Sequence, residues 1–123
     1  MLPEKFQQVL QHEGVVAIAT QGPDGPHLVN SWNSYMEIAS GNKLLIPAGY
    51  MNETETNIAK NDKVQLTVGS KEVEGFNGPG TGFLVKGTAK FIKSGASYES
   101  LKSRFPWMRA VLEITVDNVA QTL

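Results

Sequence analysis

Short runs in which apolar and polar residues alternate recur along this 123-residue chain. Because successive side chains of a β-strand point to opposite faces, this alternation predicts strands with one buried face. The expected strands are Gly14–Gln21, His27–Ile38, Lys43–Ala48, Lys63–Val68, Phe83–Ile92 and a closing strand that runs through Thr115 or Val116. A cluster of glycine and proline at Gly22–Pro26 indicates a hairpin, and Gly87 is expected to mark a β-bulge.

Helices are expected at three places. The segments Pro3–His12 and Ser97–Phe105 carry apolar residues at the spacing of one helical face. A third short helix is expected after a bend at Gly49–Tyr50, where glycine permits a positive φ. Asn52 is expected to be the N-cap of this helix, and Glu55, three residues on, completes a capping-box pattern.

About six strands with antiparallel connections and two or three short helices favour a closed or partly closed β-barrel. The length suits a single domain that covers residues 1–123. The glycine-rich segment Ser70–Gly82 lacks the Lys-Ser or Lys-Thr that completes a phosphate-binding P-loop. It is therefore interpreted as a plain connection between strands.

The composition narrows the functional classes. A hydrophobic content of 41%, a charged content of 19% and a net charge of −1 describe an ordinary globular protein, with no basic cluster for nucleic acid. No apolar run approaches the roughly 20 residues of a membrane span, and no leader peptide is visible, so a cytoplasmic location is expected. The absence of cysteine excludes disulfides and iron–sulfur clusters. A redox function therefore requires a bound organic cofactor.

Residues for catalysis are scarce, and we assign none. The two histidines, His12 and His27, have no partner at metal-ligand spacing, so no metal site is expected. Ser31 lies in no nucleophile elbow. The adjacent acids Glu53 and Glu55 are explained as partners of the helix dipole. Hydrolysis is thus disfavoured.

Two segments carry more polar or special residues than a strand or a turn requires. The run Asn30–Tyr35 presents amide, hydroxyl and aromatic groups, which suit either a half-solvated strand or a ligand surface. The strand, bend and helix within Leu44–Val68 direct backbone N–H groups to one point. That arrangement is either a capped corner or a phosphate site.

Three runs of the sequence, GVVAIATQGPDGPHLVNSWNSY, IPAGYMNETETNIAKNDKVQLTV and GPGTGFLVKGTAKF, resemble small bacterial flavoproteins of the pyridoxamine-phosphate oxidase-like FMN-binding split-barrel family. The closing ITVDNVAQTL agrees as well, so the resemblance extends over essentially the whole chain. It implies a mainly β fold, namely a six-stranded antiparallel split β-barrel with short helices. It also implies a homodimer with one FMN per subunit near the dimer interface.

The resemblance further implies a set of FMN-binding residues on separate segments of the chain. They are Asn30, Ser31, Trp32 and Tyr35 along the flavin; Pro47, Ala48, Gly49 and Tyr50 past the isoalloxazine ring; Asn52, Glu53 and Thr54 at the phosphate; and Trp107 and Leu123, which approach from the partner subunit. The assignment of Leu123 rests on the resemblance alone.

The chain departs from the family pattern at the phosphate, where Glu53 stands in place of a lysine. An anion near the phosphate costs roughly 3 kcal/mol at about 5 Å in an effective dielectric near 20, and less where water screens it. We therefore expect FMN binding that is weaker by about 10- to 100-fold. Tyr50, where the relative has a small glycine, is expected to reshape the pocket.

Three functions remain open. The first is an FMN-binding electron carrier between redox partner proteins, in which the flavin does the chemistry. The second is a flavin-dependent reductase or oxidase that acts on a nicotinamide or a small organic substrate. The third is a split-barrel binding module that has lost FMN because of Glu53.

Overall fold

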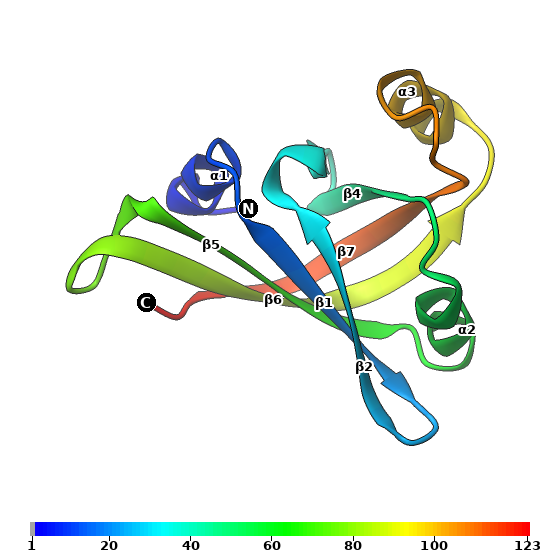
Figure 1. Ribbon diagram of the computed structural model, residues 1–123, viewed down its shortest axis with the longest axis horizontal. Coiled ribbons are helices and arrows are strands. Elements are labelled where there is room, and N and C mark those ends of the chain that lie inside the picture. Colours follow the sequence, from blue (N-terminus) through cyan, green and yellow to red (C-terminus); the bar gives the residue numbers. More distant parts are fainter. Residues whose placement is uncertain (1) are drawn as a thin grey trace.

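The computed structural model describes residues 2–123, which form one antiparallel sheet with three α-helices packed on it (Figure 1). The strands are β1 (Val15–Gly22), β2 (Gly25–Trp32), β3 (Glu37–Ala39), β4 (Lys43–Ala48), β5 (Lys63–Gly75), β6 (Gly78–Ile92) and β7 (Ala110–Gln121). The helices are α1 (Glu4–Leu10), α2 (Asn52–Lys60) and α3 (Ala96–Arg104), with a short 3-10 turn, η1 (Asn33–Tyr35). Within residues 2–123 no helix has both the length and the apolar composition needed to cross a membrane.

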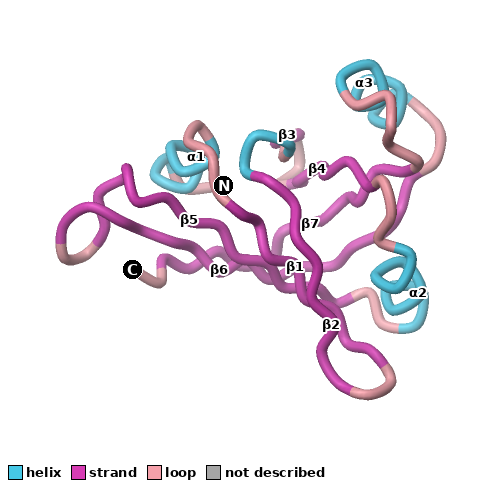
Figure 2. The backbone as a smooth tube through the Cα atoms, in the orientation of Figure 1, coloured by secondary structure: helices cyan, strands magenta, loops and turns pink. Residues whose placement is uncertain are grey.

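The strands follow the spatial order β2-β1-β5-β6-β7-β4-β3, and all neighbouring pairs are antiparallel. The sheet does not close, since β2 and β3 form its two edges. Figure 2 shows β1 and β2 running across β6 and β7, as a strongly twisted sheet does when it wraps around a core. The predicted mainly β, antiparallel fold is confirmed. The sheet is an open, split barrel of seven strands rather than six.

The additional strand arises because the predicted strand His27–Ile38 is broken after Trp32. Asn33 is fully buried, and its side-chain amide donates hydrogen bonds to the carbonyl oxygens of His12 (2.9 Å) and Gly69 (3.2 Å). These contacts, with a further bond to the Val9 carbonyl (3.3 Å), tie the chain to α1, to the residue His12 that follows it and to β5, and the backbone makes the turn η1 instead of continuing the ladder. The predicted alternation of faces is therefore correct only up to Trp32.

The prediction of a plain connection at Ser70–Gly82 is wrong, because β5 and β6 continue through it as a long hairpin. Gly75 permits this pairing, since a Cβ there would lie 2.0 Å from the carbonyl oxygen of Gly80. The bulge predicted at Gly87 is confirmed by a register shift between Lys86 and Gly87. The closing strand also extends beyond its predicted end, to Gln121.

Apolar side chains form two clusters on opposite faces of the sheet. The main cluster includes Phe6, Ile18, Leu44, Leu66 and Ile114 and is covered by α1. The second cluster lies under α3 and consists of Leu45, Leu101, Phe105, Met108 and Val111. Each large side chain buried in this way contributes about 1.5–3 kcal/mol, which fixes the register of β4 and β7 between the clusters. The end of β4 and the connection from α3 to β7 are thereby held side by side.

Candidate functional site

The site is organised by the corner between β4 and α2. The chain leaves β4 at Ala48, bends at Gly49–Tyr50 and enters α2 after Met51. The residue with a positive φ at this corner is Met51, at 57°. The sequence predicts Gly49 in this role, and that prediction is wrong. Met51 is the N-cap residue, without a side-chain cap, so the predicted capping role of Asn52 is wrong. The Met51 carbonyl accepts the first helical hydrogen bond, from the N–H of Glu55 (2.9 Å).

Ionic contacts hold this corner in place. Arg109 donates two hydrogen bonds to the carbonyl oxygen of Tyr50, at 2.9 and 2.7 Å from Nε and Nη2. Its Nη1 also lies 2.7 Å from Oε1 of Glu55, and Lys93 Nζ lies 2.9 Å from Oε2. Hydrogen bonding to Lys93, together with Arg109, lowers the pKa of the Glu55 carboxyl below its ordinary value. Glu55 thus anchors the corner and does not complete a capping box.

A cleft of about 540 Å³ opens beside this corner. It is lined by Val29, Asn30, Ser31, Trp32, Tyr35, Pro47, Gly49, Tyr50, Met51 and Trp107. Eight of these residues belong to the predicted set of FMN-binding residues. The structure therefore brings these eight together within one chain. Val29 and Met51 are additional lining residues that the sequence did not single out.

Aromatic rings dominate the walls of the cleft. The ring centroids of Tyr35 and Trp107 lie 5.8 Å apart, and Phe105 packs behind both, at 4.9 and 5.6 Å. Trp32 and Tyr50 are exposed, Tyr50 to 85%. Flat apolar rings with polar edges suit the stacking of a planar heteroaromatic ligand. Trp107 reaches the cleft from the same chain as Trp32, so no partner subunit is needed to bring it there.

The start of α2 adds polar groups next to the cleft. Thr54 is fully buried, and within the described residues its hydroxyl has no hydrogen-bond partner. An unpaired buried hydroxyl is costly, and Thr54 is not among the residues that line the cleft. Asn52 and Glu53 are exposed. Ala48 is fully buried and contributes its backbone, since its carbonyl accepts a hydrogen bond from the N–H of Arg109 (2.9 Å).

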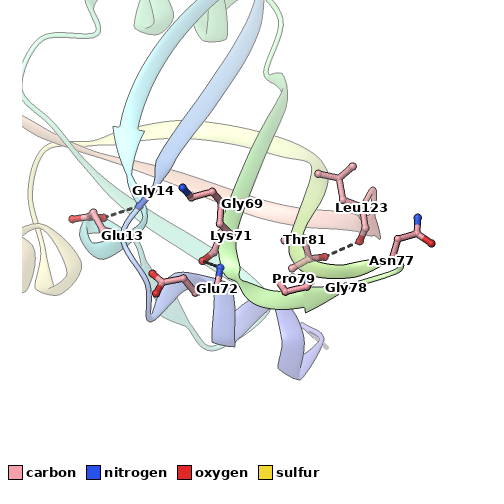
Figure 3. Close-up of a pocket in the computed structure, with 12 residues that line it drawn as sticks. Glu13, Gly14, Gly69, Lys71, Glu72, Asn77, Gly78, Pro79, Thr81 and Leu123 are labelled. Atoms are coloured by element: carbon pink, nitrogen blue, oxygen red, sulfur yellow. Dashed lines mark hydrogen bonds between the residues drawn. The ribbon is translucent and has the colours of Figure 1, made fainter.

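Leu123 lies elsewhere, on a second cleft of about 670 Å³ (Figure 3). The hydroxyl of Thr81 and the amide of Gln121 donate to the Leu123 carbonyl oxygen at 2.9 and 2.8 Å, while its side chain stays exposed. In Figure 1 this end of the chain lies at the left beside the β5–β6 hairpin, whereas α2 lies at the right. Within one chain, therefore, Leu123 is not part of the cleft beside α2.

The second cleft includes Glu13, which sequence reasoning missed. Its carboxylate accepts hydrogen bonds from the hydroxyl of Ser34 (2.7 Å) and from the Ser34 N–H (3.1 Å). These bonds lower the pKa of Glu13 below its ordinary value. The only sequence signal for this cleft was the glycine-rich run Gly78–Gly82, which had been interpreted as a plain connection.

Fold and site together define a small split barrel with an aromatic cleft beside a helix start, and comparison with known proteins gives its family. The family described as pyridoxamine 5'-phosphate oxidase matches residues 2–123, and the chain belongs to it. The chain is 54% identical, over the full length of both proteins, to the FMN-binding protein of Nitratidesulfovibrio vulgaris strain Miyazaki F.

Solved structures with low sequence identity share the fold. HupZ of Group A Streptococcus superposes with a TM-score of 0.80 at 20% identity, covering 98% of this chain and 94% of that one. An FMN-binding protein from Syntrophomonas wolfei gives a TM-score of 0.75 at 12% identity, covering 98% of this chain and 85% of that one. At these identities the likeness establishes the fold only.

Proposed function

We propose that this chain binds one FMN in the cleft beside α2 and serves as a small electron carrier. The observation that carries FMN binding is the cleft of about 540 Å³, walled by aromatic rings, that opens beside the start of α2. Trp32, Tyr50 and Trp107 suit the planar ring, and the first turn of α2 suits the phosphate. The 54% identical relative that carries the name FMN-binding protein supports this proposal.

Bound FMN supplies electron transfer, and the chain's own residues set access to it. Among the residues that line the cleft, tyrosine is the only type with an ionisable side chain, because no His, Asp, Glu, Lys or Arg is present. A dedicated oxidase or reductase that moves protons to or from a substrate uses such groups. Their absence from the lining supports an electron carrier that exchanges electrons with partner proteins, and we expect it in the cytoplasm.

We further propose that the protein is a homodimer in which the partner subunit's Leu123 completes the flavin site. The side chain of Leu123 is 63% exposed, although its backbone is held by hydrogen bonds. An exposed apolar side chain on a fixed backbone suits contact with another surface. Because Leu123 and the aromatic cleft lie apart in one chain, only a second copy can bring the two together.

The test is the visible spectrum of the purified protein, followed by titration with FMN and with riboflavin while flavin fluorescence is recorded. We expect yellow protein, or quenching that saturates at one FMN per chain, with weaker binding of riboflavin because it lacks the phosphate. Colourless protein that does not quench FMN fluorescence would overturn the proposal and favour a binding module without flavin.

A specific observation keeps a reductase as the second candidate. Trp32, Tyr50 and Trp107 are all exposed at the mouth of the cleft, so a small planar substrate can reach a ring bound there. The two functions differ in their kinetics. A carrier is expected to be reduced faster by a protein electron donor than by a nicotinamide under the same anaerobic conditions, and a reductase shows the reverse order.

A further inference from the structure

The first turn of α2 contains two carboxylates, Glu53 and Glu55, and no cation. The basic residue of this helix, Lys60, lies in its last turn. Acids at a helix N-terminus stabilise the helix, but they repel a phosphate bound at the same place. A phosphate site at this position therefore needs positive charge from another element of the fold.

Glu55 already has its partners. Its two carboxylate oxygens pair with Lys93 and Arg109, and Arg109 is also bound to the carbonyl oxygen of Tyr50. Both cations are therefore committed to the corner between β4 and α2. The charge that remains to be balanced is that of Glu53.

Glu53 is paired with the neighbouring strand β2. Its Oε2 lies 3.0 Å from Nδ1 of His27, whose side chain is about a quarter exposed. His27 stands opposite Thr20 on β1, and the Thr20 hydroxyl accepts a hydrogen bond from Asn57 of α2 (3.1 Å). The imidazole thus lies on the face of the β1–β2 ribbon that α2 covers. Within residues 2–123 no group hydrogen-bonds to its other nitrogen, Nε2.

We infer that His27 supplies the cation that faces the ligand phosphate in this chain, and that Glu53 is a positioning residue for its imidazole ring. The inference rests on the proposed function, because the phosphate is that of FMN. A protonated imidazole donates from both nitrogens, so Nδ1–H binds Glu53 while Nε2–H is left for a phosphate oxygen. His27, held by the carboxylate of Glu53, thereby takes the role of the lysine that the family pattern has at position 53.

This arrangement makes phosphate binding depend on pH. Histidine is the side chain that changes its charge within the physiological pH range, and a bound phosphate favours the protonated form. Binding therefore takes up a proton, and affinity for the phosphate falls as the pH rises. Few other ionisable groups face His27: β1 carries none, the β1–β2 turn carries Asp24, and α2 carries Glu53 together with Glu55 and Lys60.

The experiment measures the dissociation constants of FMN and riboflavin for the wild-type protein and for His27→Gln, from about pH 5.5 to about pH 8.5. The phosphate of FMN itself titrates near pH 6, but this contribution is common to both proteins and cancels in the ratio of their dissociation constants. We expect His27→Gln to bind FMN about tenfold more weakly at the acidic end and about equally at the alkaline end. For riboflavin the ratio stays near one throughout.

A second variant, His27→Lys, separates the charge from the shape of the side chain. Lysine keeps its proton far above this pH range, so we expect this variant to bind FMN about tenfold more tightly than the wild type at about pH 8.5. A ratio for His27→Gln that does not change with pH, or the same ratio for riboflavin as for FMN, would overturn the inference while FMN binding stands. A wild-type protein that binds no FMN at any pH would overturn the proposed function and this inference with it.

Discussion

Gly49 and Trp107 show how a single residue sets the shape of the cleft. A Cβ on Gly49 would lie 3.0 and 3.2 Å from two ring carbons of Trp107, closer than side chains normally approach. Glycine at this position therefore gives room to the neighbouring ring, and the backbone angle of the bend does not call for it. The sequence indicated Gly49 because glycine permits a positive φ. Local sequence patterns could not reveal the contact with Trp107, which lies 58 positions away.

We predict that Trp32→Ala increases the fluorescence of bound FMN at least severalfold, because Trp32 lines the cleft and an indole ring in contact with a flavin quenches its emission. The measurement is the fluorescence lifetime at saturating FMN. Phe76→Ala is the matched control, since Phe76 is an exposed aromatic residue at the tip of the β5–β6 hairpin, away from the cleft. An unchanged lifetime in Trp32→Ala would mean that Trp32 does not touch the ring.

We also predict that Glu53→Lys tightens FMN binding by about 10- to 100-fold, because a cation replaces an anion at the helix start and takes over the role inferred for His27. The dissociation constant is measured by fluorescence titration, with riboflavin as the ligand without phosphate. Glu99→Lys changes the charge by the same amount in the first turn of α3 and serves as the control. Equal gains in the two variants would show that only the net charge of the protein matters.

At the scale of elements, local patterns predicted most strands and helices, whereas the irregular elements depended on distant contacts. The helices α1 and α3 and the strands β1 and β4 lie close to their predicted positions, and β6 ends at its predicted residue, Ile92. The turn η1 was not predictable, because it forms where Asn33 bonds to carbonyl groups of α1 and β5. The cap of α2 was misplaced because a methionine in the left-handed region, Met51, runs against its intrinsic preference.

The corner between β4 and α2 is stabilised by the ion pairs of Glu55 with Lys93 and Arg109. These ion pairs make the stability of the corner depend on pH. The pKa of Glu55 is lower in the folded protein than in the unfolded chain. Its stabilising contribution is therefore fully present above the unfolded pKa, about 4.3, and is lost as the pH falls through the lower folded value. Within residues 2–123, Arg109 is the only side chain that hydrogen-bonds to the carbonyl oxygen of Tyr50.

We predict that Glu55→Gln lowers the free energy of unfolding by about 1–2 kcal/mol at about pH 7, and that the difference disappears at about pH 2. Urea denaturation at both pH values measures it. Glu99→Gln is the control, because Glu99 is an exposed carboxylate in the equivalent first turn of α3. A loss in Glu55→Gln that persists unchanged in acid would attribute the effect to packing and not to the ion pairs.

At the scale of the whole molecule, the ribbon of β1 and β2 has two apolar faces. Its inner face carries Val16 and Ile18 into the main core. On its outer face, cross-strand pairing places Val15 beside Trp32 and Ala19 beside Leu28, and the larger of these side chains are exposed. This outer face continues through Trp32 into the aromatic cleft. An apolar surface that ends at the proposed flavin site is where the homodimer would place its interface.

We predict that Leu28→Glu converts the dimer to a monomer and weakens FMN binding, whereas Ile38→Glu does neither. Leu28 and Ile38 are exposed apolar residues, at 68% and 42%, on the two edge strands β2 and β3, so the two substitutions place the same charge at opposite edges of the sheet. Burying two copies of the new carboxylate against each other opposes association only if Leu28 lies in the interface. Light scattering gives the mass, and titration of the same samples gives the affinity. A monomeric Leu28→Glu protein with unchanged FMN affinity would separate the two proposals: the interface would stand, and Leu123 of the partner subunit would have no part in the flavin site.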